Sequence, residues 1–400
     1  FFFKQKTAYE IRNCDWSSDV CSSDLKTKAS GDGGLISLGH STSPHALSLS
    51  GFGIISSDTQ GAGQAGAVIL NGSSISINQT KSISSTSGSG NAGTITVNAD
   101  TLNLDNNASL TTQSGEPKAP PAATGSTGKI AITGIKSITL DHGSQINTTT
   151  SSTNAYKLDE DLGHITITSP SITLSGNSSI NSGSTGAAGG GSITLSGSSI
   201  KLDGATTTAQ TSGSGKGGGI SLKANLINLA NSSTVTSQVQ GSGQGGSLTI
   251  NTGSLSLTKS SEISSTTTSV AGGGDIVINP VANSATLSIN FDANAAATGI
   301  SASGIRSSSS FQGPVSGDQA KVGAIRVGST PSDQLTIQGF GEIKSDAAGS
   351  GRSGGILVGA SDSNGTTTTQ AKATTIGPGT TFSAPGSNIT ATASDTLQID

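Results

Sequence analysis

The chain has 400 residues, with 57 glycines, 2 cysteines, no methionine and a formal net charge of −4. A weakly acidic chain without a basic cluster is a poor candidate for binding nucleic acid, so we expect no nucleic-acid partner. Apolar runs fall well short of the roughly 18 residues that a membrane-spanning helix needs, so we expect no transmembrane segment.

The first residues differ in kind from the rest of the chain. They hold the only tryptophan, Trp16, and both cysteines, Cys14 and Cys21. They lack the apolar core of a signal peptide. The runs KQKTAYEI and DWSSDVCSSDL each resemble one reading frame of a sequencing-library adapter. We therefore predict that residues 1–25 are a disordered, adapter-derived artefact and that the natural chain begins near Lys26; the alternative is a genuine disulfide-bearing extension.

From there on, the phrase Gly-x-aliphatic-x-aliphatic recurs eleven times. The steps between successive first aliphatic residues are 32, 27, 35, 35, 28, 27, 28, 28, 49 and 31 residues. Repeats of this length predict a stacked architecture. The first aliphatic residues are Ile36, Val68, Ile95, Ile130, Ile165, Ile193, Ile220, Leu248, Ile276, Ile325 and Ile356.

Each repeat holds three short runs in which aliphatic residues alternate with small polar ones, as at 94–97, 101–104 and 108–111. Such alternation predicts strands with one buried face. The segments between these runs are too short to hold crossover helices. One repeat buries about five aliphatic side chains, each of which stabilises the fold by roughly 1.5–3 kcal/mol. This gain is smaller than the conformational-entropy cost of ordering the residues of one repeat. We therefore expect an all-β fold, a parallel β-helix of about eleven stacked three-strand coils spanning roughly 50 Å.

The repeat region is expected to cover residues 26–400. Loop insertions are predicted near 115–127, 150–162 and 291–322, and these are the candidate positions for ligand binding. The last run, 396–400, has the pattern of a second strand without its third. With neither end carrying a polar cap, we expect an internal fragment of a longer protein.

Glycine-rich segments match the pattern GxGxxG five times, beginning at Gly61, Gly88, Gly213, Gly241 and Gly349. A dinucleotide site needs this pattern between a strand and a helix, but here a predicted strand follows. Lys216 is followed by Gly rather than by Ser or Thr, so the pattern is not a phosphate-binding loop either. We attribute these glycines to positive φ at tight corners and to close backbone approach between coils.

Asp105 and Asp141 are the best candidates for a pair of catalytic carboxylates. Each follows the second strand of its repeat, so stacking in matching register brings them within about 5 Å. Turn formation is the interpretation we favour, because Asp side chains commonly hydrogen-bond within turns. The four histidines, His40, His45, His142 and His164, have no metal-ligand spacing, and His164 is expected on the outer surface. We therefore assign no catalytic, cofactor-binding or metal-binding residue and expect no cofactor.

The runs GSGNAGTITVNADTLNLDNNASLTTQSG at 88–115 and GSGQGGSLTINTGSLSLTKSSEISS at 241–265 resemble the repeats of filamentous-haemagglutinin-like exoproteins of the two-partner secretion pathway, closest to the large cyanobacterial versions. The resemblance implies a right-handed parallel β-helix, export through an outer-membrane pore and a secreted or cell-surface location. The NPNL-type motifs of that family's secretion domain are absent, and the only Asn-Pro pair is Asn279–Pro280. No functional residue of the family can therefore be carried over.

Two functions remain open. The first, which we favour, is a structural or adhesive rod that contacts a host-cell, extracellular-matrix or polysaccharide surface and has no catalytic activity. The second is a carbohydrate-active β-helix enzyme, a polysaccharide lyase or hydrolase. An enzyme is expected to interrupt the repeat with unlike carboxylates, arginines and aromatic residues on one face, and the sequence has no clear interruption of that kind.

Overall fold

The computed structural model is all-β, and its strands pair in parallel except for one hairpin, β28 (Ala360–Ser363) with β29 (Thr366–Thr369). No helix occurs within the residues that it describes. This confirms the predicted all-β class and the parallel pairing. The described residues are 23–27, 31–40, 45–115, 125–151, 163–269, 271–281, 286–292, 303–311, 322–347, 354–363, 366–378, 380–384, 389–391 and 396–399.

Strands that begin at the recurring aliphatic residue pair with one another in a first ladder. The aliphatic residues stand in register, so that Ile36 pairs with Val68 and Val68 with Ile95. The first ladder consists of β2 (Ile36–Leu38), β5 (Val68–Asn78), β7 (Ile95–Asp105), β9 (Ile130–Leu140), β11 (Ile165–Thr168), β14 (Ile193–Ser196), β17 (Ile220–Ala230), β19 (Leu248–Leu257), β21 (Ile276–Asn279), β24 (Ile325–Val327), β27 (Ile356–Val358) and β32 (Ile389–Ala391).

A second ladder follows directly in each repeat. In β5, β7, β9, β17 and β19 one continuous strand serves both ladders, so two of the three predicted runs merge there. The pairing of β7 with β9 shifts register between Ala99 and Thr101, where the strand passes from one ladder to the other. The remaining strands of the second ladder are β3 (Ala46–Ser50), β12 (Ser171–Ser175), β15 (Ser199–Asp203), β22 (Thr286–Asn290), β25 (Ser332–Gln338), β30 (Ala371–Ile376) and β33 (Thr396–Ile399).

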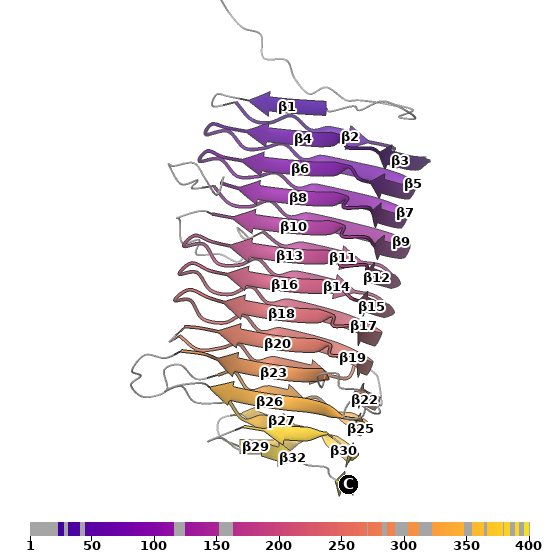
Figure 1. Ribbon diagram of the computed structural model, residues 1–400, viewed down its shortest axis with the longest axis vertical. Helices are drawn as coiled ribbons and strands as arrows, with labels where there is room; N and C mark the ends of the chain where they lie inside the picture. The colour runs from indigo at the N-terminus through magenta and orange to yellow at the C-terminus, as the bar shows by residue number, and fades with distance from the viewer. Residues whose placement is uncertain are drawn as a thin grey trace, which may run out of the picture.

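The third strand of each repeat belongs to a 12-stranded parallel sheet. Figure 1 shows its strands stacked along the long axis of the molecule, with β1 at one end and the last strands at the other. The sheet consists of β1 (Ser23–Thr27), β4 (Ile54–Thr59), β6 (Lys81–Thr86), β8 (Ser109–Ser114), β10 (Gln145–Thr150), β13 (Ser179–Ser184), β16 (Thr206–Thr211), β18 (Thr234–Val239), β20 (Glu262–Thr267), β23 (Ser303–Ser309), β26 (Gly341–Ala347) and β31 (Thr381–Ser383).

The core is one continuous cluster of aliphatic side chains between these strands. Ile75, Leu102, Ile138 and Ile172 stand in register on successive layers of the second ladder and are at most 1% exposed. Each such residue contributes roughly 1.5–3 kcal/mol by leaving water. We use "layer" for the strands that one repeat contributes. Because every layer covers its neighbours, the core extends with the number of layers.

The corner glycines of the Gly-x-aliphatic phrase are explained by close approach between layers. A Cβ built on Gly93 would overlap the carbonyl oxygen of Gly66, and one on Gly66 would overlap that of Gly34. Positive φ was the other predicted reason, and for these corner glycines it is wrong. Among the residues that the structure describes, positive φ occurs at other glycines, such as Gly143 and Gly204.

Several boundaries differ from the sequence expectations. Ile389 pairs with Ile356 and begins a further repeat, which the glycine spacing did not reveal. The range 291–322 contains strand β23 of the 12-stranded sheet, so it is not a single loop insertion as predicted. Strand β1 begins at Ser23, three residues inside the segment expected to be adapter-derived, and the first 22 residues lie outside the described ranges. Residues 116–124 and 152–162, which make up most of the other two predicted insertions, also lie outside the described ranges.

Candidate functional site

The candidate carboxylates lie at the turns that join the second ladder to the 12-stranded sheet. After Asp105 the two central residues of the turn, Asn106 and Asn107, have φ of 53° and 64°. The amide of Ala108 donates to the carbonyl oxygen of Asp105 at 3.2 Å, which closes the turn. Two positive φ values inside such a four-residue turn are the mark of type I′, which favours Asn and Gly.

The neighbouring layer repeats this turn with different residues. His142 and Gly143 have φ of 48° and 75°, and the Ser144 amide donates to the Asp141 carbonyl oxygen at 3.2 Å. Leu104 pairs with Leu140 directly before the two aspartates. The structure therefore brings Asp105 and Asp141 to the same corner of adjacent layers, as matching register requires.

His142 lies between the two carboxylates. Its Nδ1 is 2.7 Å from Asp105 Oδ1 and 3.5 Å from Asp141 Oδ2. The pKa of His142 is raised above its ordinary value, first by the hydrogen bond to Asp105 and then by the negative charges of Asp141 and Asp105. The side chain is 65% exposed, so solvent screens these interactions strongly.

The hydrogen bonds of this cluster serve the turns. Asp105 Oδ1 accepts from the Asn106 amide at 2.9 Å, and Asp141 Oδ1 accepts from the His142 amide at 2.8 Å. Each carboxylate is thus held by the first backbone amide of its own turn, which is a local side-chain-to-backbone hydrogen bond. His142 was the participant that sequence reasoning missed, although it follows Asp141 directly.

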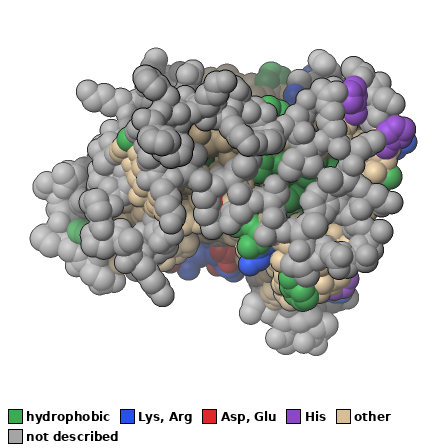
Figure 2. All heavy atoms as spheres, turned by 90° about the horizontal axis from the view of Figure 1, so that it is seen from above, with side chains coloured by type: hydrophobic (Ala, Val, Ile, Leu, Met, Phe, Trp, Pro, Cys, Tyr) green, Lys and Arg blue, Asp and Glu red, His purple; other side chains and the backbone are tan. Residues whose placement is uncertain are grey.

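His164 belongs to the corner before β11. It is half-buried, and its Nδ1 accepts from the Ser192 amide at 3.0 Å and lies 2.7 Å from Ser192 Oγ. Viewed down the long axis, the visible histidine side chains lie at the edge of the molecule (Figure 2). In the described part of the chain, no group of three or more His, Cys, Asp or Glu side chains is placed to hold a metal ion.

A second polar feature, a buried column of hydroxyl groups, was not predicted. Ser84 Oγ donates to the Gly66 carbonyl oxygen at 2.9 Å and accepts from the Gly93 amide at 2.9 Å. The column thus joins the interior of the 12-stranded sheet to the corner glycines of adjacent layers. The in-register positions that donate to such a glycine carbonyl are Ser57, Ser84, Thr112, Thr148, Ser182, Ser237, Ser265 and Ser307.

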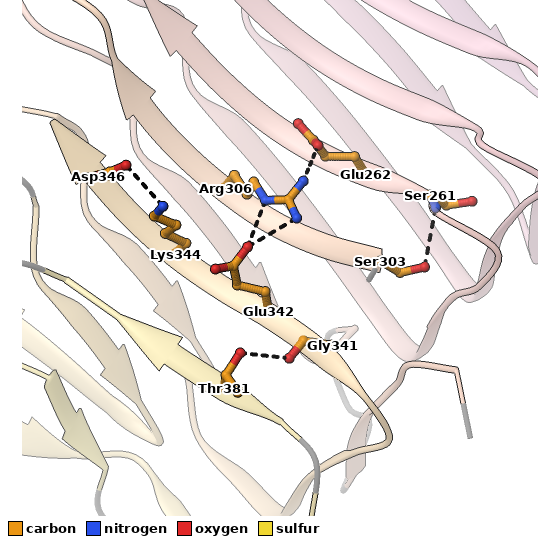
Figure 3. Close-up of polar contacts among 9 residues, drawn as sticks. All are labelled: Ser261, Glu262, Ser303, Arg306, Gly341, Glu342, Lys344, Asp346 and Thr381. Atoms are coloured by element: carbon orange, nitrogen blue, oxygen red, sulfur yellow. Dashed lines mark hydrogen bonds and ion pairs between the residues drawn. The ribbon is translucent and has the colours of Figure 1, made fainter. Parts of the chain in front are cut away.

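On the outer face of the same sheet, three charged side chains bridge three neighbouring strands. Arg306 on β23 lies between Glu262 on β20 and Glu342 on β26 (Figure 3). Its Nε and Nη2 atoms are 3.1 and 3.0 Å from Glu342 Oε2. All three side chains are about 30% exposed. The two ion pairs connect three neighbouring strands and stabilise the register of the sheet.

Comparison with known proteins gives no relative from which a role could be transferred. No protein-family model, no curated protein and no solved structure matches the chain. The residues that the structure describes include no helix long and apolar enough to cross a membrane.

Proposed function

We propose that the chain is a right-handed parallel β-helix that serves as a structural and adhesive rod segment of a large secreted bacterial surface protein, of the filamentous-haemagglutinin-like type. The handedness follows from a general rule, since connections between parallel strands of one sheet are almost always right-handed. About eleven or twelve coils spaced by about 4.8 Å form a rod of roughly 50–60 Å.

The observation that carries this proposal is the persistence of one side-chain register through the whole stack. The same columns of aliphatic residues, corner glycines and buried hydroxyls recur from layer to layer. Such a molecule lengthens by adding layers, and each layer is stabilised by its two neighbours. It presents long, repeated outer faces, which suit attachment to an extended surface. Export through an outer-membrane pore and location at the cell surface belong to the same proposal.

The alternative is a carbohydrate-active enzyme, and one observation favours it. Asp105 and Asp141 are two carboxylates on adjacent layers with a histidine between them, on the outer surface of the molecule. Paired carboxylates are the usual acid and base of glycoside hydrolysis. Against this reading, both groups accept hydrogen bonds from the backbone amides of their own turns.

Adhesion and catalysis can be measured on the same preparation. Beads coated with the full chain are expected to be retained under flow on surfaces coated with extracellular matrix or polysaccharide, whereas albumin-coated beads are washed off. Polysaccharides incubated with the chain are expected to show no new reducing ends or unsaturated products. Wild-type beads that wash off like albumin-coated beads would contradict the adhesive role. Cleavage that disappears in the Asp105→Asn, Asp141→Asn double variant would establish the enzyme instead.

A further inference from the structure

A groove crosses the outer face of the 12-stranded sheet, toward the carboxyl ends of β8, β10, β13 and β16. Its volume is about 720 Å³, within the range of pockets that bind small ligands. Gly183 lines the groove at an outward position of β13 and has no side chain to fill it. A Cβ built there would have only Thr149 Cγ2 within reach, at 3.8 Å. The missing side chain therefore leaves a gap between the outward side chains of the neighbouring strands.

The lining has a single chemical character. Every lining residue that the structure describes is Ser, Thr, Asn, Gln or Gly, with no charged, aliphatic or aromatic side chain among these described residues. The amides are partly ordered before any ligand arrives, because Asn181 Nδ2 donates to Asn147 Oδ1 at 3.1 Å and Asn147 Nδ2 donates to Gln145 Oε1 at 3.0 Å. Fixed amides and hydroxyls provide both donors and acceptors at low entropic cost.

This composition selects among possible ligands. A nucleic acid or anionic polymer requires Lys or Arg side chains, and the described part of the lining contains none. An apolar helix requires hydrophobic anchors. An extended peptide requires an open strand edge, but the groove lies on a sheet face whose strands already pair on both sides. A polymer of neutral sugars needs an array of donors and acceptors, which the groove offers.

The spacing of the array points the same way. The groove runs along the stack from Gln113 on β8 to Gln238 on β18, so equivalent amides and hydroxyls recur at every layer, about 4.8 Å apart. The length of one pyranose unit in an extended glycan is close to that spacing. We propose that this groove binds a neutral polysaccharide chain laid along the long axis, with about one sugar unit per layer. The inference rests on the proposed adhesive function and names its ligand class.

Native gel electrophoresis in gels containing a polysaccharide tests the groove directly. Dextran, laminarin, xyloglucan and galactomannan are the neutral probes, and alginate is the anionic one. We expect at least one neutral polysaccharide to retard the full chain and alginate to have no effect. In the Gly183→Ile variant, which fills the groove at a position open to a side chain, the retardation is expected to be lost.

The matched control is Ser308→Ile, which places the same side chain in the same outward column of the sheet but outside the groove. It is expected to bind like the wild type, and circular dichroism checks that both variants are folded. Retardation that persists in Gly183→Ile, disappears in both variants, or occurs only with alginate would overturn the proposal. If retardation persists in Gly183→Ile and wild-type beads adhere under flow, the groove is refuted while the adhesive function stands.

Discussion

Equivalent side chains form the same hydrogen bond in successive layers of this molecule, so small contributions add up. One buried hydroxyl that hydrogen-bonds to a glycine carbonyl contributes about 1 kcal/mol, and eight positions of the column form this bond; at Ser57, Ser84 and Ser265 the hydroxyl also accepts from a glycine amide. Ala209 occupies the same column and cannot form these bonds. At the turns after β7 and β9, positive φ falls on Asn106, Asn107, His142 and Gly143, and Asp105 and Asp141 each fix the next backbone amide.

His142 provides a prediction at this scale. Its pKa is raised above 6.5, with the hydrogen bond to Asp105 as the largest cause. A raised pKa in the folded state stabilises the fold at pH values below the ordinary pKa, and this contribution is lost as the pH rises through the raised value. We expect the Asp105→Asn variant to shift the pKa of His142 back toward 6.5. Side-chain NMR of His142 across a pH titration measures both values.

The same variant has a consequence for stability. Its deficit relative to the wild type is expected to be larger at about pH 5.5 than at about pH 8.5, because only protonated His142 gains from the carboxylate. Since His142 is exposed, the difference is expected to be small. Equal deficits at both pH values, or an unchanged pKa in Asp105→Asn, would contradict the role given to this pair.

At the scale of the strand, register is determined by what faces the neighbouring layer. The corner glycine allows adjacent backbones to approach closely, and the aliphatic residue two positions later enters the core. On the outer face, the ion pairs of Arg306 with Glu262 and Glu342 join β20, β23 and β26. This is the region where the spacing between successive repeats is longest. These contacts bias the strands against slipping, because a shift by one residue would turn the aliphatic side chains outward.

Replacing a corner glycine tests this account. Gly93→Ala places a Cβ against the Gly66 backbone, and overpacking of this kind costs about 1–3 kcal/mol. We expect the free energy of unfolding, measured by urea titration with circular dichroism, to fall by at least that amount. Gly183→Ala is the matched control, since its Cβ would make only an ordinary contact, 3.8 Å from Thr149 Cγ2; it is expected to stabilise the strand by about 0.5–1 kcal/mol. Similar effects in both variants would show that close packing is not why glycine occupies the corner.

The strands were largely predictable because alternation of aliphatic and polar residues records which face is buried. The hydroxyl column was not, because a buried Ser84 and an exposed serine look alike in a sequence. Strand β32 was missed because the glycine that normally precedes the first aliphatic residue is displaced before Ile389. The adjacency of Asp105 and Asp141 followed from register, but the contact of His142 with Asp105 spans 37 positions and depends on turn geometry.

At the scale of the whole molecule, each layer contacts mainly the layers before and after it. Pairings join consecutive repeats throughout the first and second ladders and the 12-stranded sheet. Stability is then approximately a sum of layer terms and nearest-neighbour interface terms. A rod of this kind tolerates a change in the number of layers far better than a change in register within one layer.

Deletion of one complete repeat tests this expectation. Removing residues 220–247 joins Gly219 to Leu248, restores the Gly-x-aliphatic phrase and allows β19 to pair with β14 in place of β17. We expect this variant to keep its β-sheet circular dichroism and unfold cooperatively, with a modest loss of stability. Removing only residues 220–233 takes out β17 but keeps β18, so the first and second ladders lose a strand while the sheet does not. That variant is expected to unfold at a clearly lower urea concentration, and equal stability of the two deletions would show that the layers do not behave as exchangeable units.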